Sequence, residues 1–391
     1  MTATSARQRF DGIDALRGLV IVIMIIDHAR EYAGGTGVTD PMQLDAVSPL
    51  LFWMRWLTHF CAPVFTLLAG VSAGLQDAGH PAPRAWSWHH VGRGAVLVLL
   101  EFTVIQFAWT FSFVWPMRYA QVICGIGVSL IVLGLLQRVP VAARVALGAV
   151  IVCGHNALDS WHPVTPAWLH WSWAILHDRQ IMPLWGEHTV RTSYPVLPMI
   201  GLVLLGDGLG RWLRTASSAA RRTWLLSGGL MLVTLFVLLR TSNVYGDPFP
   251  ASSTGDVLRD VMSLLNVTKY PMSLSFLCMT IGPALVLLAA WVDSAPPWSA
   301  PLRRMGQVPM FMYLGHLYLL HSAMLLWALF QGYAPAAFDF RAKITGLPAG
   351  FGFPLWQTFP IVLITVLALY PAAGWYATLR ASKRLWITRY V

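Results

Sequence analysis

Long apolar stretches separated by short polar segments make up most of the chain. Ten of these stretches are long enough, at about 20 helical residues each, to cross the roughly 30 Å hydrocarbon layer of a membrane. They lack the alternation of apolar and polar residues that is typical of membrane barrel strands. The pattern predicts an all-α, polytopic membrane helical bundle with spans near residues 13–32, 50–75, 91–110, 119–137, 142–157, 194–213, 224–240, 273–292, 309–331 and 357–379.

Composition supports the same class of protein. Hydrophobic residues make up 56% of the 391 residues and charged residues only 11%, whereas charged residues make up about 25% of an ordinary soluble domain. No linker, low-complexity run or internal repeat divides the chain. We therefore predict a single transmembrane domain over residues 1–391. Within it, Gly70 and Gly74 predict close packing between two helices.

The net charge of +10 raises the question of nucleic-acid binding, but the basic residues follow the predicted loops instead. Of the 27 lysines and arginines, sixteen fall on the side that holds both termini, ten fall on the other side and Arg17 lies in the first span. By the positive-inside rule, both termini are expected in the cytoplasm and residues 158–193 outside. We expect no nucleic-acid partner.

The cysteines give no sign of a disulfide framework or a zinc site. All four lie inside predicted spans and none shows paired spacing: Cys61, Cys124, Cys153 and Cys278. We interpret them as packing residues and expect no metal.

Residues 17–30 of the first apolar stretch carry four ionisable residues, Arg17, Asp27, His28 and Arg30. A charge near mid-bilayer costs about 2.5–3.5 kcal/mol on insertion scales, so such residues are normally retained for a site, a pathway or a partner. Arg17 and His28 are eleven residues apart. This spacing places them within about 20° of one helix face and about 16 Å apart along the axis. We expect the chemistry on this face.

Polar residues from other spans are expected in the same outer half of the membrane. Arg55 and His59 begin the second span, while Lys269 and Tyr270 precede the eighth. Polar groups that faced lipid would destabilise a bundle, so an inward-facing cluster is favoured.

Each of these residues also has a purely structural interpretation, which the sequence leaves open. Asp27 and Arg30 fit an i,i+3 ion pair at the membrane edge, and His28 fits an interfacial histidine. Arg55 and Lys269 fit snorkelling charges at helix ends, and His59 fits core packing. His316 and His321 fit a hydrogen-bonding pair between helices.

Four segments, spread in order along the chain, together resemble a known family. They are similar to bacterial membrane proteins of the heparan-alpha-glucosaminide N-acetyltransferase-like group: RFDGIDALRGLVIVIMIIDHAREY (9–32), LLFWMRWLTHFCAPVFTLLAGVSAGL (50–75), TKYPMSLSFLCMTIGPALVLLA (268–289) and GQVPMFMYLGHLYLLH (306–321). The first segment also resembles the broader membrane acyltransferases, in which an arginine and a histidine share the eleven-residue spacing. Arg17 and His28 match those positions.

The resemblance implies an acyl-CoA-dependent O- or N-acetyltransferase of the bacterial inner membrane. It would move an acetyl group from cytoplasmic acetyl-CoA to an amine or hydroxyl of a sugar or glycan on the periplasmic side. His28 would be the general base, or a transient acyl carrier, with Asp27 or a neighbouring helix orienting its ring. Arg55, His59 or Lys269 would stabilise the oxyanion of the reacting thioester.

The same resemblance implies a set of binding residues and partners. Arg17 would contact the CoA arm or hold the helix, and Tyr270 and His316 join Arg55 and Lys269 in the substrate- or CoA-binding set. Expected partners are acetyl-CoA, a sugar or glycan acceptor and membrane lipids. The oligomeric state is left open, with a homodimer as one option.

One departure from the family pattern offers a second base. In the lysosomal branch the position matching His28 is typically asparagine, and the catalytic histidine lies in the outer loop that follows. Here residues 33–51 contain no histidine and offer only Asp40 and Asp45. Asp40 is therefore the rival base, with His28 polarising the carbonyl.

Two other function classes compete with the acetyltransferase. A transporter or channel for a small sugar or anion would also contain buried charges and many helices, but transporters usually show repeated halves, and the chain shows no such repeat. A non-catalytic assembly or lipid-binding protein would not need the outer polar cluster.

Overall fold

The computed structural model describes residues 10–33, 42–78, 83–341 and 344–382. It is mostly helical, as the apolar pattern predicts. The helices are α1 (Asp11–Ala33), α2 (Pro49–Thr58), α3 (Cys61–Asp77), α4 (Pro83–Leu100), α5 (Gln106–Thr110), α6 (Val122–Leu135), α7 (Val141–Gly154), α8 (Ala167–Leu176), α9 (Leu197–Thr215), α10 (Ser218–Ser242), α11 (Val257–Leu265), α12 (Leu274–Trp291), α13 (Ala300–Gly306), α14 (Pro309–Phe330) and α15 (Thr358–Ala381).

Each predicted span coincides with a helical stretch. In the part of the chain that the structure describes, seven stretches are long and apolar enough to cross a membrane: Pro49–Asp77, Trp88–Thr110, Val141–Leu158, Ser218–Ser242, Leu274–Trp291, Pro309–Phe330 and Leu355–Ala381. The other three predicted spans contain α1, which carries several charges, the shorter α6, and α9. A multi-pass helical membrane protein is thus confirmed, while ten spans and cytoplasmic termini stay predictions.

Two helical stretches are interrupted where the sequence predicted continuous spans. The stretch Pro49–Asp77 turns at His59 and Phe60, between α2 and α3. Pro63 explains this turn, because it has no N–H to bond the His59 carbonyl and its ring would clash with that carbonyl. Between α4 and α5, residues Glu101–Ile105 form a π-helical turn.

A small sheet, which the all-α prediction did not include, lies outside the long helices. Its strands are β1 (Met117–Ala120), β2 (Ile181–Pro183) and β3 (Thr189–Thr192), in the order β1-β3-β2. The strands β1 and β3 are parallel, and β2 and β3 are antiparallel. The predicted span at 119–137 is therefore wrong at its first residues, because their backbone groups pair with those of β3 instead of forming helix.

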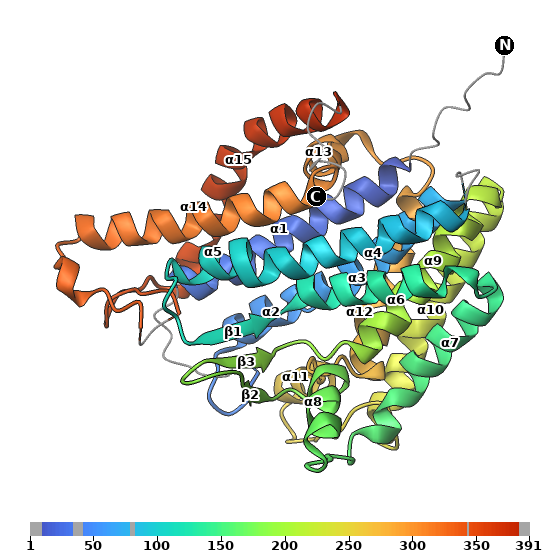
Figure 1. The fold of residues 1–391 in the computed structure, drawn as a ribbon, viewed down its shortest axis with the longest axis horizontal. Helices are drawn as coiled ribbons and strands as arrows, with labels where there is room; N and C mark the ends of the chain where they lie inside the picture. Colours follow the sequence, from blue (N-terminus) through green and yellow to red (C-terminus); the bar gives the residue numbers. More distant parts are fainter. Residues whose placement is uncertain (1–9, 34–41, 79–82, 342–343, 383–391) are drawn as a thin grey trace.

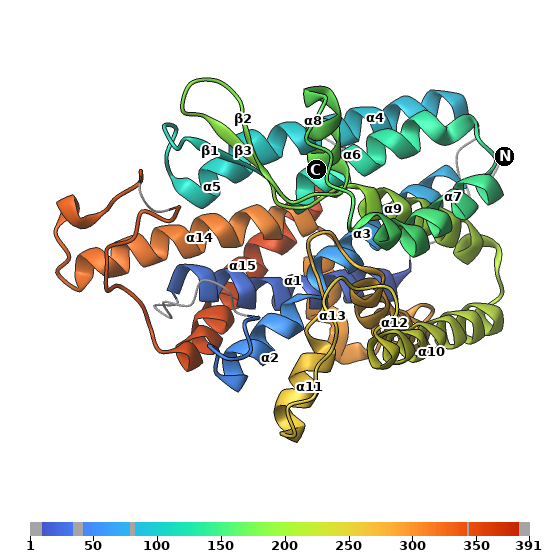
Figure 2. The same cartoon turned by 90° about the horizontal axis from the view of Figure 1, so that it is seen from below.

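In Figure 1 the long helices α1, α4 and α14 run roughly side by side from left to right, with shorter elements above and below them. The helix α13 lies at the upper edge of Figure 1, whereas α8, α11 and the sheet lie at the lower edge. The view in Figure 2 separates α11 from α8 and the sheet, which lie on opposite sides of the bundle. The helices α8 and α11 and the sheet belong to segments that the sequence assigns to the outside.

Glycines allow the helices that carry the site to pack closely. A Cβ atom on Gly70 of α3 would lie 2.3 Å from the Val203 carbonyl oxygen of α9, and one on Gly74 would lie 2.1 Å from that of Asp207. The predicted close-packing role of Gly70 and Gly74 is therefore confirmed. On α1, Gly18 has the same relation to Leu302 of α13, at 1.9 Å. Backbones in contact at these points hold α1 and α3 in fixed positions.

Candidate active site

The C-terminal end of α1 carries an ion-pair network centred on Asp27. Its Oδ1 accepts a hydrogen bond from Arg30 Nη2 at 3.0 Å, and its Oδ2 accepts one from Arg55 Nη1 of α2 at 2.5 Å. The expected i,i+3 pair of Asp27 and Arg30 is therefore present, but Arg55 is not a simple snorkelling charge. Because Asp27 holds two guanidinium groups, it joins α1 to α2 and does not contact His28 as its orienting partner.

Two tyrosines and two more cations extend this network. Arg55 Nη2 lies 3.5 Å from the Tyr270 hydroxyl. The Tyr194 and Tyr270 rings meet edge to face at 4.9 Å, and the Arg179 guanidinium lies 4.3 Å from the Tyr270 ring centroid. Lys269 Nζ is 5.4 Å from the same centroid. The result is a cationic cluster at the C-terminal end of α1, to which Asp27 supplies a compensating charge.

The charges of this cluster act on the Tyr270 hydroxyl. Burial by itself would raise the pKa of Tyr270, but the positive charges of Lys269, Arg55 and Arg179 and a hydrogen bond from Tyr194 outweigh it and lower the pKa to about 8. Tyr270 therefore changes charge much closer to neutral pH than an ordinary tyrosine.

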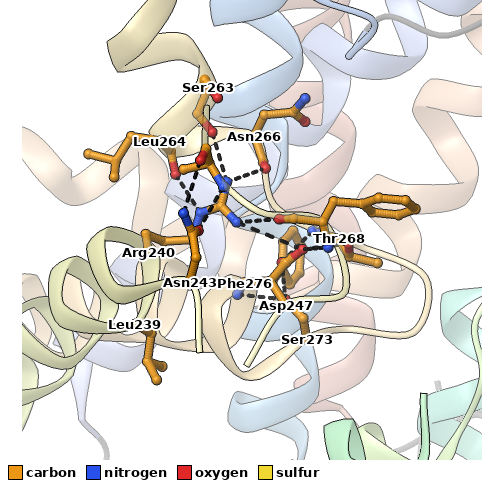
Figure 3. A network of polar contacts seen from close by, with 12 residues as sticks. Leu239, Arg240, Asn243, Asp247, Ser263, Leu264, Asn266, Thr268, Ser273 and Phe276 are labelled. Atoms are coloured by element: carbon orange, nitrogen blue, oxygen red, sulfur yellow. Dashed lines mark hydrogen bonds and ion pairs between the residues drawn. The ribbon is translucent and has the colours of Figure 1, made fainter. Parts of the chain in front are cut away.

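A hydrogen-bonded network holds the segment between Thr268 and Ser273, which carries Lys269 and Tyr270 (Figure 3). Buried Arg240, at the end of α10, donates to four backbone carbonyl oxygens, those of Phe249, Ser263, Leu264 and Asn266, at 2.6–3.1 Å. Asp247 accepts from the Thr268 N–H at 2.8 Å and from the Ser273 hydroxyl at 2.7 Å. Since Thr268 and Ser273 flank Lys269 and Tyr270, this network fixes both ends of the segment.

His28 contacts a second histidine instead of an acid. Its Nδ1 lies 2.6 Å from His316 Nε2 of α14, and His316 Nδ1 lies 2.7 Å from the Met312 carbonyl oxygen. A carbonyl can only accept, so His316 must carry its proton on Nδ1. Neutral His316 then accepts at Nε2, and His28 donates from Nδ1. Neutral His28 consequently keeps the lone pair on Nε2, which has no hydrogen-bond partner among the described residues.

Aromatic side chains surround the His28 ring. Trp109 and Tyr313 meet it edge to face, at centroid separations of 5.0 and 6.0 Å. The ring is only partly buried. Its Nε2 can therefore act as a base toward a bound molecule, and His316 determines which nitrogen is available.

A cleft of about 640 Å³ lies along α1 from Ile13 to Met24, and His28 itself is not among its lining residues. Met24 and Tyr313 line it next to His28, and Arg17 lines it on the same helix. Arg17 donates to Asp14 at 2.9 Å and also contacts Ser72 of α3. Three further arginines line the same cleft, namely Arg93, Arg214 and Arg380. The cleft thus joins a strongly basic region to the surroundings of His28.

Two of the other sequence candidates, His59 and His321, have different surroundings. His59 is 1% exposed, its ring packs edge to face on Phe276 at 5.2 Å, and its Nδ1 has no hydrogen-bond partner in the described chain. His321 does not pair with His316 but faces the carbonyls of Ala108 and Thr345, at 2.9 and 2.8 Å. Asp40 lies outside the described residues.

Sequence reasoning missed four side chains of the site. Trp109 and Tyr313 flank His28, and Tyr194 and Arg179 contact Tyr270. Tyr313 had a usable signal, since it lies three residues before His316 and therefore on the same helix face. The other three had none, because only tertiary folding brings their segments to the site.

Comparison with known proteins gives one match. The family model for the heparan-alpha-glucosaminide N-acetyltransferase catalytic region matches residues 9–243, which is more than half of the chain. The chain belongs to this family. A search of curated proteins gave no significant match.

Membership of the heparan-alpha-glucosaminide N-acetyltransferase family implies a transmembrane acetyltransferase, in agreement with the apolar helices. The matched region includes Arg17, Asp27, His28 and Arg55, whereas Lys269, Tyr270 and His316 come from the part of the chain after it.

Proposed function

We propose that this acetyltransferase takes its acetyl group from cytoplasmic acetyl-CoA and transfers it to an amine or hydroxyl of a sugar or glycan on the opposite, periplasmic side of a bacterial inner membrane. The observation that carries the proposal is the cleft that joins four arginines to the surroundings of His28. Its basic part suits the phosphates of CoA, which guanidinium groups bind with charge-assisted hydrogen bonds.

The spacing of Arg17 and His28 along α1 agrees with this arrangement. Arg17 and His28 are separated by eleven helical residues, or about 16 Å along α1. A phosphate group held near Arg17 would leave an extended pantetheine-like arm to follow α1 past Met24. The thioester would then lie beside His28, between Trp109 and Tyr313.

The chemistry follows from the histidine pair. His28 Nε2 takes the proton from the acceptor amine or hydroxyl while that group attacks the thioester carbonyl carbon. The tetrahedral intermediate then collapses, the C–S bond breaks, and the CoA thiolate leaves and receives a proton. His316 is a positioning residue, because it keeps the Nδ1 proton of His28 in place and thus leaves Nε2 free.

Lys269 is the cation best suited to the oxyanion or to the acceptor. Arg55 is already bound to Asp27, whereas Lys269 Nζ has neither a hydrogen bond nor an ion pair to any residue that the structure describes. Donors positioned before the reaction begins stabilise the developing charge at least cost. The deeply packed His59 ring is a weaker candidate for this role.

Thioester turnover by the purified protein tests the proposal. With acetyl-CoA and an amino-sugar acceptor, wild-type protein should release CoA, and His28→Ala should reduce the rate by about 10²- to 10⁴-fold. His59→Ala is the control, since its ring is not hydrogen-bonded to His28. Near-normal turnover in His28→Ala together with loss in Asp40→Ala would assign the base to Asp40. Absence of turnover in the wild type with sugar passage through vesicles would support a transporter instead.

A further inference from the structure

A second cluster of histidines lies away from the cleft, where α7 ends and the outer segment begins. His155 follows α7, Asp159 follows the short helical turn His155–Leu158, and His177 follows α8. One potential ligand atom from each of these three residues lies within 4.8 Å of the others. His155 and His177 are 2% and 1% exposed, so both imidazole rings are removed from solvent.

The His155 ring is buried without hydrogen bonds. Neither Nδ1 nor Nε2 makes a hydrogen bond of normal geometry to a described residue, although the Met272 backbone lies nearby and both atoms are inaccessible to solvent. A buried polar group without a partner costs about 1–3 kcal/mol, so a folded protein normally satisfies it. A bound ion facing this ring would remove that cost.

The other two side chains are arranged as metal ligands usually are. His177 Nε2 and Asp159 Oδ1 are 3.4 Å apart. Two ligands at zinc bond lengths of about 2.0–2.1 Å in a tetrahedral site would be separated by about 3.3–3.4 Å. Asn156 Nδ2 donates to Asp159 Oδ2 at 2.8 Å, which leaves Oδ1 directed at His177. Behind the ring, Asp178 Oδ1 lies 3.9 Å from His177 Nδ1, on the side where zinc-binding histidines usually have a carboxylate.

We propose that His155, Asp159 and His177 form a binding site for one divalent zinc ion. Two imidazoles and one carboxylate are ligands that zinc accepts. His177 Nε2 lies 2.9 Å from the His155 carbonyl oxygen, so zinc binding releases the proton from that nitrogen to solvent and brings the carbonyl oxygen within reach as a fourth ligand. The cysteine spacing gave no sign of this site because the proposed ligands are two histidines and an aspartate.

The ion would brace the wall of the acetyltransferase site. Its three ligands join the end of α7 to the segment that follows α8, and Arg179, only two residues after His177, lies over the Tyr270 ring. The site is therefore structural in this proposal, and it does not depend on whether the donor is acetyl-CoA.

Metal binding to the purified full-length protein in detergent tests the site. After treatment with a chelator, zinc chloride should raise the melting temperature of the wild type, with a gain of about 100-fold in the folding equilibrium at a zinc concentration of 100 times Kd. His155→Gln and Asp159→Asn should lose this response. His162→Gln is the matched control, because His162 is 61% exposed and bonds Asp178 without belonging to the cluster.

Cobalt substitution keeps the test decisive even where a variant fails to fold. Wild-type protein loaded with Co²⁺ should show the intense visible absorption of a tetrahedral ion, and zinc should displace it at one ion per chain. The proposal is wrong if the wild type shows neither the cobalt spectrum nor a zinc-dependent shift in melting temperature. It is equally wrong if His155→Gln and Asp159→Asn respond to zinc as the wild type does. Neither readout measures acetyl transfer.

Discussion

Replacing His316 with phenylalanine should slow acetyl transfer without removing the base. The substitution deletes the acceptor for His28 Nδ1, which lies 2.6 Å away. The imidazole then has no fixed tautomer, and part of the population carries its proton on Nε2, where it cannot act as a base. A buried hydrogen bond contributes about 0.5–1.5 kcal/mol, and loss of a positioning partner typically costs about 10- to 100-fold in function.

We therefore expect the kcat of His316→Phe to fall by about 10- to 100-fold, which is less than the loss expected for His28→Ala. The KM for acetyl-CoA should change little, because His316 lies on the far side of the His28 ring from its free nitrogen. The assay is CoA release over a range of donor concentrations and pH. His316→Gln, whose amide oxygen can accept from Nδ1, should recover part of the activity and of the pH profile.

His321→Gln is the control for structural damage. His321 lies on the same helix as His316 but faces the carbonyls of Ala108 and Thr345, so its loss should affect stability more than kcat. Wild-type kcat in folded His316→Phe would refute the positioning role of His316. A fall in kcat that is equal in His321→Gln would show that the effect is structural.

Three further predictions concern the arginine cleft, the tyrosine and the support beneath it. Arg214→Ala should raise the KM for acetyl-CoA by about 10- to 100-fold, since a charge-assisted hydrogen bond contributes about 1.5–3 kcal/mol. Arg222 is exposed and outside the cleft lining, so Arg222→Ala should leave this KM unchanged. Equal increases in KM in the two variants would contradict the donor site. Ultraviolet titration should show one tyrosine ionising at pH about 8, absent in Tyr270→Phe but retained in Tyr245→Phe. Because folding lowers the pKa of Tyr270 from 10.0, wild-type stability relative to Tyr270→Phe should be unchanged below pH about 8 and should rise between pH about 8 and 10; a constant difference would contradict the assignment. Arg240→Leu should lower the free energy of unfolding by about 3–5 kcal/mol, because four backbone carbonyls lose their shared donor and the buried Asp247 carboxylate loses the positive charge 3.9 Å away. Chemical denaturation that matches the wild type would show that the network does not hold the segment.

The sequence predicted the helices well because burial in a membrane imposes long apolar stretches that local composition reveals. It also placed Arg17 and His28 on one helix face; Arg17 lines the cleft, and His28 contacts Tyr313, which lines it too. The turn at His59 was within reach, since Pro63 lies four residues later and cannot complete the helix there. These features depend on residues close together in the chain.

The partners of His28 could not be predicted in the same way. His316 is 288 residues away, and a helical pattern gives no information on which helices face one another. Of the two predicted partners for the His28 ring, Asp27 is not the one found, because Arg30 and Arg55 occupy both carboxylate oxygens, and the neighbouring helix α14 supplies His316 instead. Arg179 and Tyr194 belong to the segment between α7 and α9. Its position depends on the small sheet and on α8, and no periodic pattern in the sequence predicted either element.

A density map of the protein with acetyl-CoA added tests the central claim most directly. The CoA phosphates should lie among Arg17, Arg214 and Arg380, and the pantetheine arm should follow α1. The thioester carbonyl should lie beside His28, with room for an acceptor within hydrogen-bond reach of Nε2. Density for CoA outside the cleft, or a thioester far from His28 while His28 still faces His316, would contradict the account.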